Sequence, residues 1–218
     1  MDSLDNLLRE AEIAHGHLCA GQVLGVRMAM LGCRMLGIED PRGLVTRADR
    51  KRLVTFVEID RCATDAIAVV TGCRLGKRAL KFRDWGKMAA SFLDLGRPGD
   101  SALGLEAIPG GRAVRIAALE SSKERAREMS PHIDGKNAQQ MLAYRELPDE
   151  ELFSIEWVSI PLHAREMPGY KSARIACDVC GEGINYDREI VVGDRVLCQS
   201  CAFPEARYYQ PLSGETGA

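Results

Sequence analysis

The chain has 218 residues, 46% of them hydrophobic and 28% charged, and its formal net charge is −2. This composition is typical of a globular protein and excludes a mainly disordered chain. The charge balance argues against a polyelectrolyte partner, so we expect no nucleic acid. The sequence shows neither a signal peptide nor an apolar run of roughly 18 residues that could span a bilayer. We therefore expect a cytoplasmic protein with no membrane partner.

Apolar spacing predicts two helices at the start of the chain. The first begins at Leu4, behind a capping Ser3, and ends at a His-Gly-His turn. The second covers about residues 19–36 and is apolar on nearly every side, so we expect it to be buried. A third, shorter helix is predicted over residues 63–70, with Gly72 just past its end.

The rest of the chain alternates strand and helix signals. Residues 121–147 have helical propensity, with Asn137 as a candidate N-cap, and residues 148–152 form a helical turn. A Gly/Pro loop covers residues 96–112. Strands are predicted at residues 53–60, 79–84, 87–95, 113–117 and 153–160. This order predicts an α+β fold, with a mixed or antiparallel sheet and packed helices.

Four of the eight cysteines form a metal-binding pattern near the C-terminus. Cys177 and Cys180 are one C-x2-C pair, and Cys198 and Cys201 are a second. Two such pairs can close a tetrahedron of thiolates around zinc, which leaves no open position for catalysis. We predict a structural zinc ion in a small treble-clef domain at residues 170–210. Two disulfides or four free thiols are the alternative.

The charge of this C-terminal segment indicates what it contacts. From residue 169 onward, five basic residues stand against seven acidic ones. An excess of acidic residues disfavours binding to DNA. We therefore expect the zinc domain to dock on a protein partner.

Histidines and cysteines also cluster where the first two predicted helices meet. His15, His17 and Cys19 fall within five residues. A thiol at a helix N-terminus has its thiolate form stabilised by the helix dipole. Further candidates follow the first strand and the helix after it, namely Asp60, Cys62 and Cys73. If these segments meet, sulfur and imidazole ligands suit zinc or another thiophilic metal.

Simpler interpretations exist for each of these residues. A single cysteine can be a small buried hydrophobe, and a single histidine can cap a helix. Cys33 lies among apolar residues of the second helix and is predicted to be packing. A basic run from Lys77 to Lys87 is either a solvated surface or an anion subsite near Cys73.

The sequence resembles the FmdE family, named after the E gene product of formylmethanofuran dehydrogenase operons. The resemblance covers about residues 4–160 and is carried by three motifs: His15-Gly16-His17-x-Cys19-x-Gly21, Glu58-x-Asp60-Arg61-Cys62-x-x-Asp65 and Thr71-Gly72-Cys73. Two departures are visible. Ala20 stands where the family has proline, and the loop 96–112 looks longer than the family's hairpin turn.

The resemblance implies an α+β core domain, here residues 1–165, that is often dimeric, so we expect a homodimer. It implies that some members carry a treble-clef finger after this core. It also implies a metal site built from the His-Gly-His-x-Cys motif and the later cysteines, and an association with molybdenum or tungsten formylmethanofuran dehydrogenase.

Three functional hypotheses follow. In the first, the protein is a metal-binding accessory protein of molybdenum or tungsten enzyme metabolism, with a second metal ion, most simply zinc, in the core. In the second, it is a metal-dependent enzyme that acts on an anionic small molecule. In the third, cysteines of the core exchange disulfides, which the absence of a C-x-x-C pair there disfavours.

The enzyme hypothesis assigns roles to individual residues. His17, Cys19 and Cys62 would hold the metal, which leaves a position open for water or substrate. Catalytic roles would fall to His15, Asp60 and Cys73, and the anion would be bound by Lys77 and Lys87.

Overall fold

The computed structural model describes residues 1–46, 52–96 and 112–210, so most of the predicted loop 96–112 lies outside the described residues. The chain divides into two compact units. The first contains residues 1–163 and 167–169, and the second contains residues 164–166 and the chain from Tyr170 onward. Across the described ranges, no helix combines the length and apolarity needed to cross a membrane.

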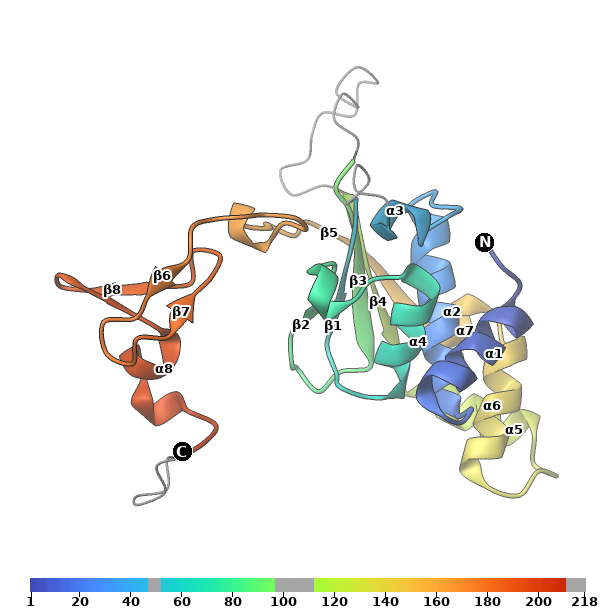
Figure 1. The fold of residues 1–218 in the computed structure, drawn as a ribbon. Coiled ribbons are helices and arrows are strands. Elements are labelled where there is room, and N and C mark those ends of the chain that lie inside the picture. Colours follow the sequence, from blue (N-terminus) through green and yellow to red (C-terminus); the bar gives the residue numbers. More distant parts are fainter. Residues whose placement is uncertain (47–51, 97–111, 211–218) are drawn as a thin grey trace. The chain divides into compact units, whose positions relative to one another are not determined.

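A five-stranded mixed sheet forms the centre of the first unit, with strand order β2-β1-β3-β4-β5 (Figure 1). Strand β2 is parallel to β1, and every other neighbouring pair is antiparallel. The strands are β1 (Leu53–Val57), β2 (Leu80–Phe82), β3 (Ala89–Asp94), β4 (Arg112–Ala118) and β5 (Phe153–Val158). The predicted α+β class is confirmed.

Helices cover one face of this sheet (Figure 1). The long ones are α1 (Leu4–His15), α2 (Ala20–Met35), α4 (Cys62–Thr71), α5 (Ser121–Met129) and α6 (Lys136–Glu146). Short helices α3 (Gly43–Thr46) and α7 (Asp149–Leu152), and a 3-10 turn η1 (Leu75–Lys77), complete the unit. Helix α2 contacts β3, β4 and three helices, α1, α4 and α6, which explains why its sequence is apolar on nearly every side.

Helices α2 and α4 approach each other closely because α2 carries a glycine at their contact. A Cβ atom at Gly25 would lie 2.5 Å from the Ala63 carbonyl oxygen and 2.8 Å from the Ala66 Cβ. Any larger residue would therefore push the two helices apart. This approach brings the N-terminal ends of α2 and α4 together.

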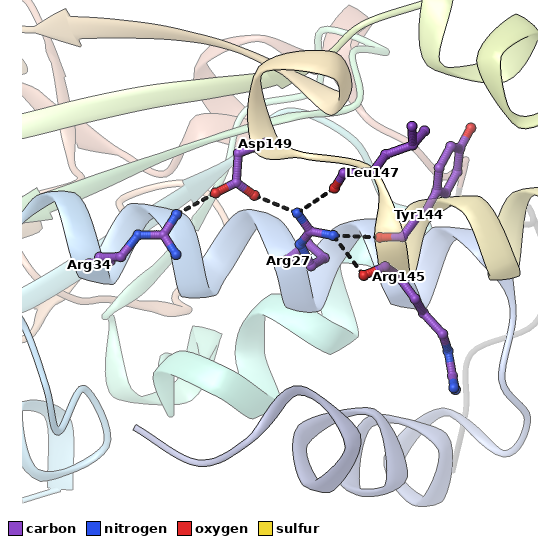
Figure 2. A network of polar contacts seen from close by, with 6 residues as sticks. All are labelled: Arg27, Arg34, Tyr144, Arg145, Leu147 and Asp149. Atoms are coloured by element: carbon purple, nitrogen blue, oxygen red, sulfur yellow. Dashed lines mark hydrogen bonds and ion pairs between the residues drawn. The ribbon is translucent and has the colours of Figure 1, made fainter.

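An arginine of α2 fixes the C-terminal end of α6 (Figure 2). Arg27 donates hydrogen bonds to the carbonyl oxygens of Tyr144, Arg145 and Leu147, at 2.8, 3.2 and 2.9 Å. It also donates to the Asp149 carboxylate at 2.7 Å. The last carbonyls of a helix lack partners within that helix, so Arg27 satisfies groups that α6 leaves open.

Asn137 has a different role from the one predicted. Helix α6 begins at Lys136, behind Gly135, which has a positive φ of +92° and is the N-cap residue, so Asn137 is not its N-cap. The Asn137 Oδ1 atom instead accepts a hydrogen bond from the Ala20 N–H at 3.0 Å. It therefore caps the first turn of α2, from far along the sequence.

The second unit consists of two short hairpins and a helical turn. The hairpins pair β6 (Ile175–Ala176) with β7 (Gly183–Ile184) and β8 (Ile190–Val192) with β9 (Arg195–Leu197). Helix α8 (Gln199–Ala202) and the 3-10 turns η3 (Ala164–Glu166) and η4 (Pro204–Ala206) complete it. Its own small core contains Cys177, Ile184 and Leu197.

Candidate metal centres

The four cysteines of the second unit converge on one point. Their sulfur atoms all lie within 4.8 Å of one another. Cys177 and Cys180 flank a tight turn. Gly181 follows this turn with a positive φ of +74°, and its N–H donates a hydrogen bond to the Cys177 carbonyl oxygen. Cys198 is the N-cap of α8, and Cys201 lies in that helix. The sequence spacing predicted this convergence.

The electrostatics of these four thiols fit a divalent cation. Backbone N–H groups of Cys180 and Cys198 lower the pKa of the Cys177 thiol to about 6. The Cys198 side chain and burial raise the pKa of the Cys201 thiol to about 12. Four sulfurs at this separation cannot all ionise without a compensating charge, and zinc bound by four thiolates supplies it.

A second group of ligand atoms lies in the first unit. One ligand atom from each of His15, His17 and Cys19 lies within 4.8 Å of the other two. His15 is the last residue of α1, and Gly16 reverses the chain with a φ of +96°. The two imidazole centroids are consequently 4.9 Å apart. Cys19 follows as the N-cap of α2.

Cys62, the first residue of α4, lies beside Cys19 of this group. A Cβ atom at Gly21 would lie 3.1 Å from the Cys62 Cβ and 3.8 Å from the sulfurs of Cys19 and Cys62. Gly21 therefore leaves room for the two thiols to meet. Burial, and then the contact with Cys19, raise the pKa of the Cys62 thiol.

The surroundings of these thiols favour a bound cation. Two neighbouring sulfurs resist becoming thiolates together, and a metal ion removes that penalty. Gln22, one turn after Cys19, donates a hydrogen bond to the Cys62 carbonyl oxygen at 2.8 Å. Its own Oε1 atom is buried and has no partner among the described residues. A buried acceptor without a donor is costly.

We call His15, His17, Cys19 and Cys62 the core cluster. Two imidazoles and two thiols are a common ligand set for zinc. Helices α2 and α4 both begin at the core cluster, and neither is capped by the side chain of its own N-cap residue. The N-terminal ends of two helices therefore lie beside the two sulfurs.

The structure does not bring Cys73 to the core cluster. Helix α4 has 10 residues, begins at Cys62 and ends two residues before Cys73, and at about 1.5 Å per residue it keeps the two cysteines about 15 Å apart. Cys73 is fully buried and accepts a hydrogen bond from the Thr55 hydroxyl at 3.4 Å. Burial is the largest influence on the acidity of the Cys73 thiol, and it raises the pKa of that thiol.

The basic residues of the predicted anion subsite are also separated. Lys77 precedes β2 and lies close enough to Cys73 for its positive charge to lower the pKa of that thiol. This effect is smaller than the increase that burial causes. Lys87 follows β2, and its ammonium lies 5.8 Å from the Trp85 ring centroid. The two lysines thus lie beyond opposite ends of one strand. Asp60 is exposed, in the turn between β1 and α4.

Asp65 is the residue near the core cluster to which the sequence assigned no role. Its Oδ2 atom lies 2.8 Å from the Nδ1 atom of His15. Asp65 follows Cys62 by three residues on α4, and residues three apart share a helix face. That spacing is the signal that could have indicated it.

Glu58 and Arg115 form a buried ion pair that also had no predicted role. Glu58 is 3% exposed, and both of its carboxylate oxygens accept hydrogen bonds from Arg115 at 2.7 Å. The Glu58 carbonyl oxygen accepts hydrogen bonds from the N–H groups of Trp85 and Lys87. The Glu58 backbone thus holds the loop between β2 and β3, while its side chain pairs with Arg115.

These features define a class of protein: an α+β domain with a histidine–cysteine cluster, followed by a four-cysteine zinc finger. Residues 14–154 match the family described as FmdE, Molybdenum formylmethanofuran dehydrogenase operon. The chain belongs to the FmdE family, as its motifs indicated. Residues 169–207 match the prokaryotic dksA/traR C4-type zinc finger, which confirms the finger.

Two known proteins are similar over most of the chain. A probable S-adenosyl-L-methionine-binding protein of Archaeoglobus fulgidus is 31% identical over 216 residues, covering 91% of this chain and 53% of the relative. The chain thus spans about half the length of that relative. The crystal structure of a tungsten formylmethanofuran dehydrogenase FmdE-like protein of Syntrophus aciditrophicus has a TM-score of 0.57, with 16% identity and coverage of 94% of this chain and 95% of that protein. At this identity the match shows a shared fold.

Proposed function

We propose that this protein is a metal-binding accessory protein of molybdenum or tungsten enzyme metabolism. The core cluster binds a zinc ion, and the finger docks on a protein partner. One observation carries the proposal: the ligand atoms of His15, His17 and Cys19 lie within 4.8 Å of one another, beside the Cys62 thiol.

The chemistry of these residues supports a bound metal. Imidazole and thiolate ligands together select zinc and other thiophilic metals over magnesium or calcium. His17 is exposed, whereas His15, Cys19 and Cys62 are half-buried, so an ion could enter from solvent and still be held on an ordered scaffold. The bound ion would supply Lewis acidity, while the protein fixes the geometry around it.

The finger has features of a docking module. Zinc bound by four cysteines is closed to chemistry. Several apolar residues around the site are exposed, namely Val179, Val191, Val192 and Phe203. Exposed apolar side chains grouped on a small domain favour contact with another protein. The family description, which names a formylmethanofuran dehydrogenase operon, supports a partner in molybdenum or tungsten metabolism.

A complementation experiment in the native host tests the accessory role. Deletion of the gene is expected to lower the activity of the host's molybdenum or tungsten dehydrogenase while its polypeptide level stays constant. The wild-type gene and a Cys33→Ala variant should restore activity, because Cys33 lies near the opposite end of α2 from Cys19. A Cys19→Ser variant should fail to restore it. Unchanged dehydrogenase activity in the deletion strain would refute the accessory role.

A metal-dependent enzyme acting on an anionic small molecule is the second candidate function. It is favoured by the close grouping of the His15, His17 and Cys19 ligand atoms, because a metal held by these three groups, with Cys62 beside it but not bound, keeps a position open for substrate or water. The name of the Archaeoglobus relative makes S-adenosyl-L-methionine the first ligand to test by calorimetry.

A further inference from the structure

We infer that Asp65 is a positioning residue for the core metal, which holds the His15 imidazole so that its Nε2 atom faces the ion. The inference rests on the proposed metal site in the core cluster. The Asp65 carboxylate would orient a metal ligand without binding the metal itself.

The contact between the two side chains links separate elements. His15 ends α1, Asp65 lies near the start of α4, and the Nδ1–Oδ2 distance is 2.8 Å. The imidazole is 19% exposed and the carboxylate 58% exposed. Helix α4 also supplies Cys62, so one helix holds both a candidate ligand and the group that orients another ligand.

The hydrogen bond determines which nitrogen of His15 is available. An ionised carboxylate only accepts hydrogen bonds, so the Nδ1 atom must carry the proton in this contact. In the neutral imidazole the lone pair is then on Nε2, which becomes the metal-binding atom. A carboxylate behind a ligating histidine fixes its orientation and increases its basicity.

The exposure of Asp65 separates this role from a structural one. An ion pair with a carboxylate that is more than half exposed adds little to folding stability. Removal of the Asp65 carboxylate should therefore leave the fold intact. Its effect should be seen in the affinity of the core cluster for a metal.

A cobalt titration of the full chain, with the finger already loaded with zinc, tests the inference. Asp65→Ala is expected to weaken cobalt binding at the core cluster by about 10- to 100-fold, which is typical for loss of such a partner. Asp65→Glu should recover most of the affinity. The control Glu12→Ala, which removes an exposed carboxylate on α1 three residues before His15, should bind cobalt like the wild type.

A spectroscopic readout identifies the nitrogen. In protein with ¹⁵N-labelled histidine and ¹¹³Cd in the core cluster, coupling between the two nuclei should appear at His15 Nε2. Cadmium coupling to Nδ1 would overturn the inference, as would equal cobalt affinities of Asp65→Ala and wild type.

The two proposals fail in different ways. If the wild type takes up zinc in its finger but no cobalt in the core cluster, both the proposed function and the role of Asp65 are wrong. If it binds cobalt and Asp65→Ala binds it equally well, the role of Asp65 alone is wrong. Circular dichroism of the metal-free variants checks that the fold is retained.

Discussion

The surroundings of each sulfur set the acidity of the cysteines in this protein. Backbone N–H groups lower the pKa of Cys177 to about 6, whereas burial, assisted by the nearby Cys73 thiol, raises the pKa of Cys33 to about 12. Cys177 lies among the four finger sulfurs, whereas Cys33 is packed in the apolar core of the first unit. The same residue type therefore serves two purposes in one chain.

The buried Cys33 thiol predicts a loss of stability at alkaline pH. In the unfolded chain this thiol ionises near its usual pKa of 9.0, but in the folded protein only near a pKa of about 12. Below pH 9 the thiol is protonated in both states, so its contribution to the free energy of unfolding is fully present. Between pH 9 and 12 the thiol ionises only in the unfolded state, which stabilises that state relative to the folded one. The free energy of unfolding should fall by about 1.4 kcal/mol from this group by about pH 10.

Urea denaturation at about pH 8 and about pH 10, followed by circular dichroism, measures this loss. The variant Cys33→Ala should lose less stability than the wild type across the interval, by about the same 1.4 kcal/mol. Part of the decline should remain, because burial also raises the pKa of Cys73. Identical declines in the two proteins would contradict this account of Cys33.

Some residues of the core cluster could be predicted, and others could not. The spacing of His15, His17 and Cys19 is local, so the sequence shows it directly. The prediction grouped Cys73 with these residues. The length of α4, however, places Cys73 far from Cys62 along the helix axis. The contact of Asn137 with Ala20 joins residues far apart in the sequence, and no local pattern encodes such a pair.

Helices and strands were predictable where burial follows a simple period. Ser3 and the apolar stripe after it predicted α1, and Ser3 caps it by accepting a hydrogen bond from the Asn6 N–H. Strand β3 shows no alternation of burial, because all six of its residues are buried. Helices cover one of its faces, and a small cluster around Val54, Leu93 and Ala113 covers the other. Burial on both faces removes the alternation that usually marks a strand.

Two arginines on α2 provide a matched pair for testing how α6 is held in place. Arg27 is 14% exposed and bonds to three carbonyl oxygens and to Asp149, whereas Arg34 is 64% exposed and contacts Asp149 (Figure 2). Arg27→Ala should lower the free energy of unfolding by about 2–4 kcal/mol, because buried acceptors lose charged donors. Arg34→Ala should cost below about 1 kcal/mol. Equal losses in urea denaturation would contradict the capping role of Arg27.

At the scale of the whole molecule, the chain has two compact units, each with its own core and its own group of metal ligands. The finger could be predicted almost completely, because its four ligands lie in two short motifs. The core cluster depends on α1, α2 and α4 meeting, and the close approach of α2 and α4 at Gly25 is a tertiary feature. Sequence spacing could suggest that meeting but could not establish it.

Anomalous X-ray scattering at the zinc edge, from crystals grown with zinc, tests the central claim most directly. Two peaks per chain are predicted, one among the four finger cysteines and one among His15, His17 and Cys19. Crystals of Cys19→Ser should lose the second peak and keep the first. A fully occupied finger peak, with no density at the core cluster of the wild-type protein, would contradict the account.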